Sequence, residues 1–274
     1  MNSQSPNDLD GEVLILRPRP EIANIVLSHP PSRNALGWSM WTQLRAAVEK
    51  VGTDDEIRAV IFSGANGVFS SGGDMKSSPA RGSGLIAPVA RLELAHQVLS
   101  MVYGLGKPTV AAVQGFAVGI GWSLVLACDI SICANDAFFL APFADRDMVP
   151  DGGSAWLLVQ RLGHNRASSL LMLGERLSAV DAAIAGVVNK LVESDEVENE
   201  ALSCAVALSS KSTDIMRLAK GLMRAAPSLT LDEFLGRELI ASALAASRED
   251  AEEGRRAFAE GRLGNTPPTA EATS

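Results

Sequence analysis

The sequence predicts an α/β core followed by a helical extension. Short apolar, β-branched runs alternate with helical patterns over the first half of the chain, and from about residue 154 onward the pattern is nearly all helical. Strands that alternate with helices are typical of an α/β core. The length of 274 residues fits one domain of about 200 residues with a smaller helical piece.

The N-terminal part is expected to form a hairpin, a helix and a buried strand. Residues 12–16 and 22–27 are apolar runs on either side of a Pro/Arg turn, which predicts two paired strands. Apolar side chains recur at helical spacing between residues 40 and 51 and predict an amphipathic helix. The run at 59–63 predicts a strand, and residues 76–83 form a polar stretch that we expect to be flexible.

The following elements are predicted on the same grounds. The apolar positions of residues 92–102 indicate a helix, 109–113 a strand, 122–127 a short buried helix and 128–133 another strand. Residues 230–233 (TLDE) have the pattern of a capping box, in which a threonine and a glutamate three residues later satisfy each other's backbone N–H groups. A late helix is therefore expected to begin there.

Composition narrows the class of partner. There are 24 Lys and Arg against 32 Asp and Glu, which gives a net charge of −8. Such a chain has no broad positive field for nucleic acid or an anionic membrane, so a phosphate-bearing ligand would need local cations. The three cysteines and three histidines stand apart, which predicts no disulfide set and no metal site. Without a signal-like or membrane-spanning run, a cytoplasmic location is expected.

Two glycine-bearing segments carry the clearest functional signal. Residues 69–75 (FSSGGDM) and 114–121 (QGFAVGIG) each follow a β-branched run, and each is expected to lead into a helix. A helix that begins at such a turn presents unpaired backbone N–H groups at its positive end. If the two turns converge, they provide a pair of donors for an oxygen that becomes negative during a reaction.

Together these segments resemble the enoyl-CoA hydratase/isomerase (crotonase) family. The resemblance covers roughly residues 12–262, although the family's usual Pro-x-Phe-x-Gly ending is missing. The matching segments are 27–36, 69–75, 107–121, 128–130, 149–158 and 250–262. The resemblance implies a core that is a spiral of ββα turns, with a C-terminal helical region that forms trimers, often as a dimer of trimers.

The same resemblance implies a division of the chain. A polar tail is expected at 1–11, the acyl-CoA-binding ββα spiral at 12–200 and the helical trimerisation region at 201–262. Residues 263–274 are rich in Pro, Thr and Ala, so we expect a disordered tail. A homotrimer or hexamer is expected, with an acyl-CoA as substrate and no separate cofactor.

The resemblance also implies the members of an acyl-CoA site. The N–H groups of Gly73 and Ile120 would form the oxyanion hole. The substrate-binding set would be Arg33, Ala35, Leu36, Ser71, Gly72, Asp74, Met75, Lys76, Gly119, Trp122, Ser123, Phe143 and Phe258. Arg33, Lys76 and Arg81 are candidates for the CoA phosphates, and Asp74 is expected to cap the helix after the first loop.

Two departures from the family pattern argue against hydration. Hydratases of the family hold a water molecule between two glutamates, and this chain has Ser123 and Phe143 at those positions. Neither side chain can act as a carboxylate base. Activation of water by two carboxylates is therefore not supported.

One carboxylate, Asp151, lies where several isomerases of the family place an aspartate, the phenylacetate-pathway isomerase among them. The resemblance implies that it takes a proton from the γ-carbon of an unsaturated acyl-CoA and returns a proton to the α-carbon. Such a reaction would belong to fatty-acid or aromatic-acid breakdown. From spacing alone, Asp151 could instead be a turn residue or the N-cap of the helix that opens near Ser154.

Two further functions stay open. A chlorobenzoyl-CoA dehalogenase of the family has a histidine base where this chain has His96, and its nucleophilic aspartate corresponds to Asp151. That pair would permit displacement or hydrolysis, although a lone histidine on a helix is usually structural. The third hypothesis is a protein that binds acyl-CoA without turning it over.

Overall fold

The computed structural model describes residues 11–76 and 86–247, together with residue 256. Backbone contacts divide the chain into two compact units, Met1–Leu208 and Ser209–Ser274. The predicted boundary after residue 200 falls inside helix α6 (Val197–Ser209), whose buried residues Val197, Ala201 and Ala205 belong to the core of the first unit. The predicted tails at 1–11 and 263–274 lie outside the described residues, apart from Gly11.

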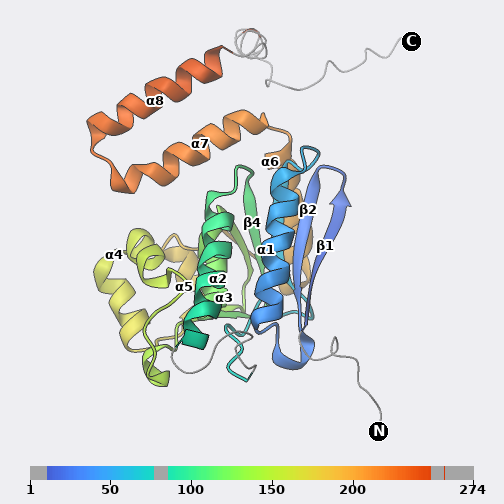
Figure 1. Ribbon diagram of the computed structural model, residues 1–274, viewed down its shortest axis with the longest axis vertical. Helices are drawn as coiled ribbons and strands as arrows, with labels where there is room; N and C mark the ends of the chain where they lie inside the picture. The colour runs from blue at the N-terminus through green and yellow to red at the C-terminus, as the bar shows by residue number, and fades with distance from the viewer. Residues whose placement is uncertain (1–10, 77–85, 248–255, 257–274) are drawn as a thin grey trace. The chain divides into compact units, whose positions relative to one another are not determined.

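The first unit is built on a six-stranded sheet of order β1-β2-β3-β4-β6-β9 (Figure 1). Only the pair β1–β2 is antiparallel, and the other neighbours are parallel. Every residue of β3 and β4 is buried, as expected of parallel strands that are covered on both faces. The strands are β1 (Glu12–Arg19), β2 (Ile22–Ser28), β3 (Ala59–Gly64), β4 (Thr109–Val113), β6 (Ile130–Ala134) and β9 (Lys190–Val192).

A second, three-stranded sheet has the order β5-β7-β8. It contains β5 (Phe116–Val118), β7 (Phe138–Leu140) and β8 (Leu177–Ser178). The strand β5 follows β4 directly and precedes the helix α3 (Ile120–Ala127), so the second glycine segment forms the connection from one sheet to the next helix.

Helices complete the first unit. The helices α1 (Trp38–Thr53) and α2 (Ile86–Gly104) lie side by side against the sheet, and α3 packs between α2 and α4 (Ser154–Met172) (Figure 1). All residues of α3 are buried. The helix α4 is interrupted at Gly163, and α5 (Ala179–Ile184) follows it.

The second unit contains α7 (Thr213–Ala225) and α8 (Leu231–Ala246), which pack against each other. The predicted capping box is confirmed, because the Thr230 hydroxyl accepts a hydrogen bond from the Glu233 N–H and the Glu233 carboxylate accepts one from the Thr230 N–H. Among the helices of the described ranges, none combines the length and the apolar character needed to cross a membrane.

Most predicted elements are confirmed within the described residues. The hairpin, the strands at 59–63, 109–113 and 128–133, and the helices at 40–51, 92–102 and 122–127 are all present within a few residues of their expected ends. The described residues after 154 are nearly all helical, as predicted, although the short strands β8 and β9 also lie there and β9 pairs with the edge of the main sheet. The first glycine segment stays non-helical as far as residue 76.

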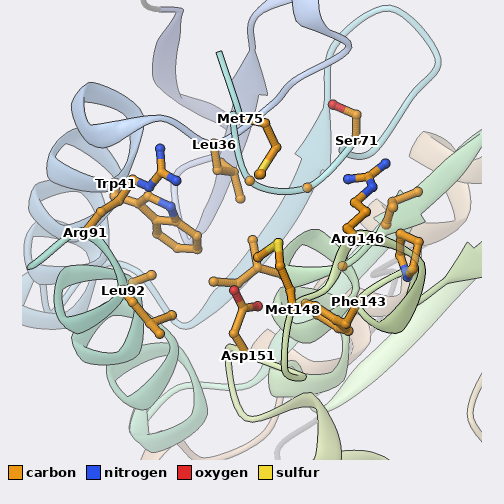
Figure 2. A pocket seen from close by; sticks show the side chains of 17 residues that line it. Leu36, Trp41, Ser71, Met75, Arg91, Leu92, Phe143, Arg146, Met148 and Asp151 are labelled. Carbon is orange, nitrogen blue, oxygen red and sulfur yellow. The ribbon is translucent and has the colours of Figure 1, made fainter. Parts of the chain in front are cut away.

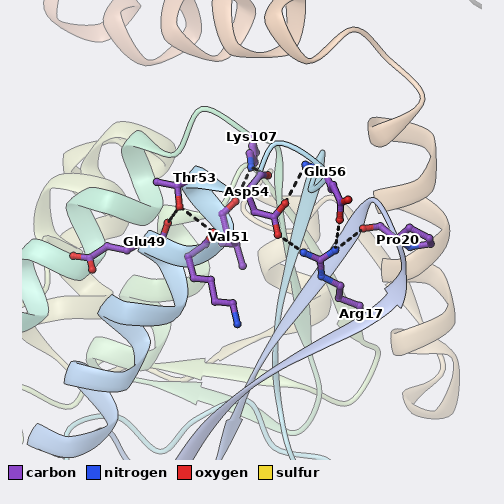
Figure 3. Close-up of polar contacts among 9 residues, drawn as sticks. Arg17, Pro20, Glu49, Val51, Thr53, Asp54, Glu56 and Lys107 are labelled. Atoms are coloured by element: carbon purple, nitrogen blue, oxygen red, sulfur yellow. Dashed lines mark hydrogen bonds and ion pairs between the residues drawn. The ribbon is translucent and has the colours of Figure 1, made fainter.

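A buried lysine fixes the end of α1 (Figure 3). Lys107 is 3% exposed, and its Nζ donates to the carbonyl oxygens of Val51 at 2.6 Å and Asp54 at 2.5 Å. The last carbonyl groups of a helix find no N–H donor within the helix, so a positively charged donor at that end is favourable. Because Lys107 comes just before β4, these bonds join the end of α1 to the start of that strand.

We predict that Lys107→Met lowers the free energy of unfolding by about 2–4 kcal/mol, because the carbonyl oxygens of Val51 and Asp54 lose their charged donor. Urea titration followed by circular dichroism would measure the change. The control is Lys50→Met, an exposed lysine in the last turn of α1, which should change stability by less than about 0.5 kcal/mol. Equal effects of the two substitutions would contradict the assigned role of Lys107.

Candidate active site

Backbone pairing brings the two glycine segments together. The Ser70 N–H donates to the Phe116 carbonyl at 3.1 Å, and the Val118 N–H donates to the Ser70 carbonyl at 3.0 Å. Gly72, with φ of +95°, lies so close to the second segment that a β-carbon there would be 2.7 Å from the Val118 carbonyl oxygen. The two turns therefore converge, as the proposed pair of donors requires.

Gly73 and Ile120, the expected oxyanion donors, line the same pocket. Leu36 brackets Gly73, because its N–H donates to the Gly72 carbonyl at 2.8 Å and its carbonyl accepts from the Asp74 N–H at 3.2 Å. Ile120 is the first residue of α3, where N–H groups have no acceptor inside the helix. In the part of the chain that is described, neither N–H has a hydrogen-bond acceptor.

The pocket has a volume of about 170 Å³ and is lined largely by apolar side chains (Figure 2). One wall comes from α1 and the first glycine segment, with Leu36, Trp41 and Met75. A second wall comes from α2, and the third comes from the second glycine segment together with residues 142–151.

Asp151 points into this pocket from the turn before α4 (Figure 2). Its Oδ1 is buried and has no hydrogen-bond partner among the described residues. The N-cap of α4 is Gly153, and no side chain caps that helix, so the interpretation of Asp151 as a capping residue is wrong. Only the backbone carbonyl of Asp151 serves the turn, where it accepts from the Ser154 N–H at 3.0 Å.

The two glycines after Asp151 allow its close approach to α3. Gly152 and Gly153 have φ of +59° and +74°, which favour glycine. A β-carbon at Gly152 would be 2.6 Å from Cγ1 of Ile120 and 2.9 Å from Oγ of Ser123. The glycine at 152 therefore lets the turn that carries Asp151 pack closely against Ile120, the residue whose N–H is the second expected donor.

Opposing effects act on the pKa of the Asp151 carboxyl group. Burial raises the pKa of its carboxyl group, while the positive charges of His96 and then Arg91 lower it, and the net direction is upward. His96 is exposed and lines a neighbouring cavity with Tyr103 and Trp156 rather than the pocket of Asp151. No His, Cys, Asp or Glu side chains within the described ranges are grouped so that they could hold a metal ion.

The other predicted site residues fall into two groups. Those that line the pocket are Leu36, Ser71, Gly72, Met75, Gly119 and Phe143. Trp122 and Ser123 are fully buried behind the pocket: Trp122 stacks on Phe139 at 5.3 Å, and the Ser123 hydroxyl donates to the Asp151 carbonyl at 3.4 Å. Ala35 is also buried.

The charged and terminal residues of the predicted set lie elsewhere. Arg33 is joined to the first glycine segment, because its carbonyl accepts from the Ser71 N–H at 2.9 Å. The carboxylate of Asp74 accepts from the Lys76 N–H at 2.8 Å, and the helix that it was expected to cap would begin outside the described residues. Phe258 and Arg81, together with most of the 76–83 stretch, lie outside the described residues.

Sequence reasoning missed two arginines of the pocket, Arg91 and Arg146. Arg91 lies on the same helix face as Leu92 and Ala95, which also line the pocket, so helical spacing from those residues was an available signal. Arg146 lies in the 3-10 turn Ala144–Arg146, for which the sequence pattern offers no such signal.

This fold and pocket define an acyl-CoA enzyme of the crotonase type. The family model described as enoyl-CoA hydratase/isomerase matches residues 19–265, and the chain belongs to that family. Among known proteins, it is 32% identical over 214 residues to the Mycobacterium bovis protein named "Probable enoyl-CoA hydratase echA12", with 76% of this chain and 75% of the relative covered. It is 29% identical over 220 residues to 4-chlorobenzoyl coenzyme A dehalogenase-1 of Arthrobacter sp, with 80% of each chain covered.

Solved structures agree with this assignment. The crystal structure of an enoyl-CoA hydratase from Polaromonas sp. JS666 is similar with a TM-score of 0.88 and 31% identity, covering 93% of this chain and 99% of that one. The enoyl-CoA hydratase from Bacillus anthracis gives a TM-score of 0.86 and 26% identity, covering 93% and 100%. The predicted family and its α/β fold with a helical C-terminal region are confirmed.

Gly72 offers a test of the convergence of the two loops. We predict that Gly72→Ala lowers the free energy of unfolding by about 3 kcal/mol or more, because left-handed strain of about 1–2 kcal/mol adds to a backbone clash. Turnover of acyl-CoA should fall with it, since the loops must separate. Gly67→Ala is the matched control, with φ of +68° and open space around the new β-carbon. An equal loss in the control would show that backbone strain alone is responsible.

The raised pKa of Asp151 predicts a pH-dependent stability. A carboxyl group whose pKa is higher in the folded state favours folding below its unfolded pKa and loses that contribution as the pH rises through the folded pKa. Asp151→Asn should therefore stabilise the protein at pH 8 and much less at pH 5, as measured by melting temperature. The exposed Asp136→Asn controls for the change in net charge. A stabilisation by Asp151→Asn that is the same at both pH values would contradict the burial effect.

Proposed function

We propose that this acyl-CoA enzyme shifts a carbon–carbon double bond of an unsaturated acyl-CoA. The observation that carries the proposal is a buried carboxylate oxygen without a partner, Oδ1 of Asp151, in a pocket that Gly73 and Ile120 also line. One acid/base group and two backbone donors are sufficient for a reaction that moves a proton between two carbons.

In the proposed reaction, the carboxylate of Asp151 takes a proton from the γ-carbon of a 2-enoyl-CoA. The electron pair delocalises into the thioester carbonyl, whose oxygen becomes negative and accepts hydrogen bonds from the Gly73 and Ile120 N–H groups. The protonated Asp151 then returns a proton to the α-carbon, which leaves a 3-enoyl-CoA, and the reverse direction uses the same steps in the opposite order. Each backbone donor contributes about 3–4 kcal/mol in comparable sites.

The surroundings of Asp151 support a group that both takes and gives a proton. Burial favours its neutral form, and the charges of His96 and Arg91 favour its ionised form. An acid/base group acts best when its pKa is close to the working pH. An aspartate exposed to water would be a weaker base than this reaction requires.

Hydration is less well supported, although several relatives carry the name of hydratase. Ser123 is fully buried and bonded to the Asp151 carbonyl, so it has no access to a water molecule in the pocket. Phe143 contributes an apolar wall. Neither position offers a second carboxylate that could share the activation of water with Asp151.

Nucleophilic displacement or hydrolysis is the second candidate, since His96 is close enough to lower the pKa of Asp151 and a dehalogenase is among the relatives. Against it, His96 lines the neighbouring cavity and is not among the residues that line the pocket of Asp151. A non-catalytic acyl-CoA-binding protein is a third candidate. It gives no reason for a buried acid beside the two donors.

The remaining features of the proposal follow the family. The acyl-CoA thioester is the ligand. The proposed reaction requires no separate cofactor, because Asp151 holds the proton between its removal from one carbon and its delivery to the other. A homotrimer or a dimer of trimers is proposed, and the exposed apolar side chains of Met172, Leu173 and Ile184 support self-association of the first unit. A role in fatty-acid or aromatic-acid breakdown in the cytoplasm is proposed with it.

Asp151→Asn tests the proposal, because asparagine keeps the shape of the side chain and cannot carry the proton. We expect isomerisation to fall on the order of 10³-fold and the affinity for acyl-CoA to change by less than about threefold, since the amide preserves the pocket. The assay follows the absorbance of the conjugated thioester formed from 3-enoyl-CoA, with uptake of solvent deuterium at the α- and γ-carbons. The control is again Asp136→Asn.

The same assay separates the alternatives. A covalent adduct trapped on Asp151 would favour the nucleophilic reaction, and binding without turnover of either enoyl-CoA would favour the binding protein. Efficient hydration of crotonyl-CoA by the unaltered protein would refute the interpretation of positions 123 and 143.

A further inference from the structure

Arg91 is a charged residue of the pocket that the proposed acid/base step does not use. It lies on α2, is half-buried, and lines the pocket together with Asp151 (Figure 2). Its Nη1 donates to the carbonyl oxygen of Asp74 at 2.8 Å. Within the described residues it forms no ion pair with a carboxylate at salt-bridge distance. Its position is therefore defined by a backbone bond to the first glycine segment.

The bond to Asp74 completes the support of the first donor. The peptide before Gly73 is held by the bond from the Leu36 N–H to the Gly72 carbonyl, and the next one by the bond from the Asp74 N–H to the Leu36 carbonyl. Arg91 holds the following carbonyl from the opposite side of the pocket, across 17 residues of sequence. Donors contribute most to catalysis when they are fixed before the charge develops.

Arg91 also places a positive charge beside the acid. Two charged or titratable groups on α2, His96 and Arg91, act on Asp151, and Arg146 lines the same pocket from the 3-10 turn. The polar neighbour from α3 is the Ser123 hydroxyl, which bonds to the backbone carbonyl of Asp151. Burial of the carboxyl and the cationic charge of Arg91 thus act on its pKa in opposite directions.

We propose that Arg91 is a positioning residue that couples the two halves of the site, because it holds the Gly73 loop through the Asp74 carbonyl and keeps its charge in the pocket of Asp151. The proposal rests on the proposed function, since it requires Asp151 to be the acid/base group. In this role Arg91 acts through Asp74 and Asp151 and need not touch the acyl-CoA.

Arg91→Gln and Arg91→Lys, measured on the full chain with 3-enoyl-CoA, test the proposal. Arg91→Gln should lower kcat on the order of 10- to 100-fold, as expected when a catalytic donor is displaced, with KM changed by less than about threefold. Because the loss of the cation raises the pKa of Asp151, the acid limb of the pH profile of kcat/KM should move to higher pH. Arg91→Lys keeps the charge, so its acid limb should stay in place while kcat recovers only in part.

The control is Arg45→Gln, which removes a surface arginine paired with Glu49 on α1 and should alter neither kcat nor the pH profile. A purely structural role would lower activity in both Arg91 variants without moving the acid limb of Arg91→Gln, and that result would overturn the proposal. If Arg91→Gln does not fold, a shifted acid limb in Arg91→Lys would overturn it as well. Failure of the proposed function is distinct, since it would appear as isomerisation retained by Asp151→Asn.

Discussion

The short backbone pairing between the two glycine segments is the interaction on which the site depends. The strands β3 and β4 are parallel neighbours, so the segments that leave them emerge at the same edge of the sheet. Ser70 then exchanges hydrogen bonds with Phe116 and Val118, so the two segments remain paired after they leave the sheet. Side chains at Gly72 and Gly121 would prevent it, because each faces the other segment at less than 3 Å. The glycines are required for this approach more than for the turns themselves.

Ile120 connects this pairing to the acid. Its N–H is the second expected donor, and its side chain lies where a β-carbon at Gly152 would be. The turn that carries Asp151 therefore packs against the residue that provides the expected donor, in a helix that is buried along its whole length. A movement of the turn at 151–153 relative to the donors would have to disturb the packing of Ile120, Ser123 and Leu99. The geometry of the site is thus set by core packing.

The sequence was sufficient for features that arise from local pattern and insufficient for those that arise from pairing. Apolar runs identify β3 and β4, whereas β8 and β9 have only two and three residues and form because a neighbouring strand edge is available. The first glycine segment is extended around Gly73 because Gly72 and Asp74 bond to the backbone of Leu36, which lies far away in sequence. Arg91 was not predicted because a helical arginine is usually solvated, and its spacing from Leu92 and Ala95 becomes a signal only once those residues are known to face the pocket.

The missing partner of the Asp151 Oδ1 has a physical consequence for the proposed reaction. A carboxylate that accepts several hydrogen bonds has a depressed pKa and is held in one orientation, so it would be a weak base and could not follow a proton from one carbon to another. A carboxyl group buried without any nearby cation would stay protonated and could not begin the reaction. Asp151 has neither environment, because burial and the charges on α2 oppose each other while its oxygen remains unbonded. The proposed transfer of a proton between the α- and γ-carbons needs an aspartate that both takes and gives a proton, and these opposing effects on its pKa support that role.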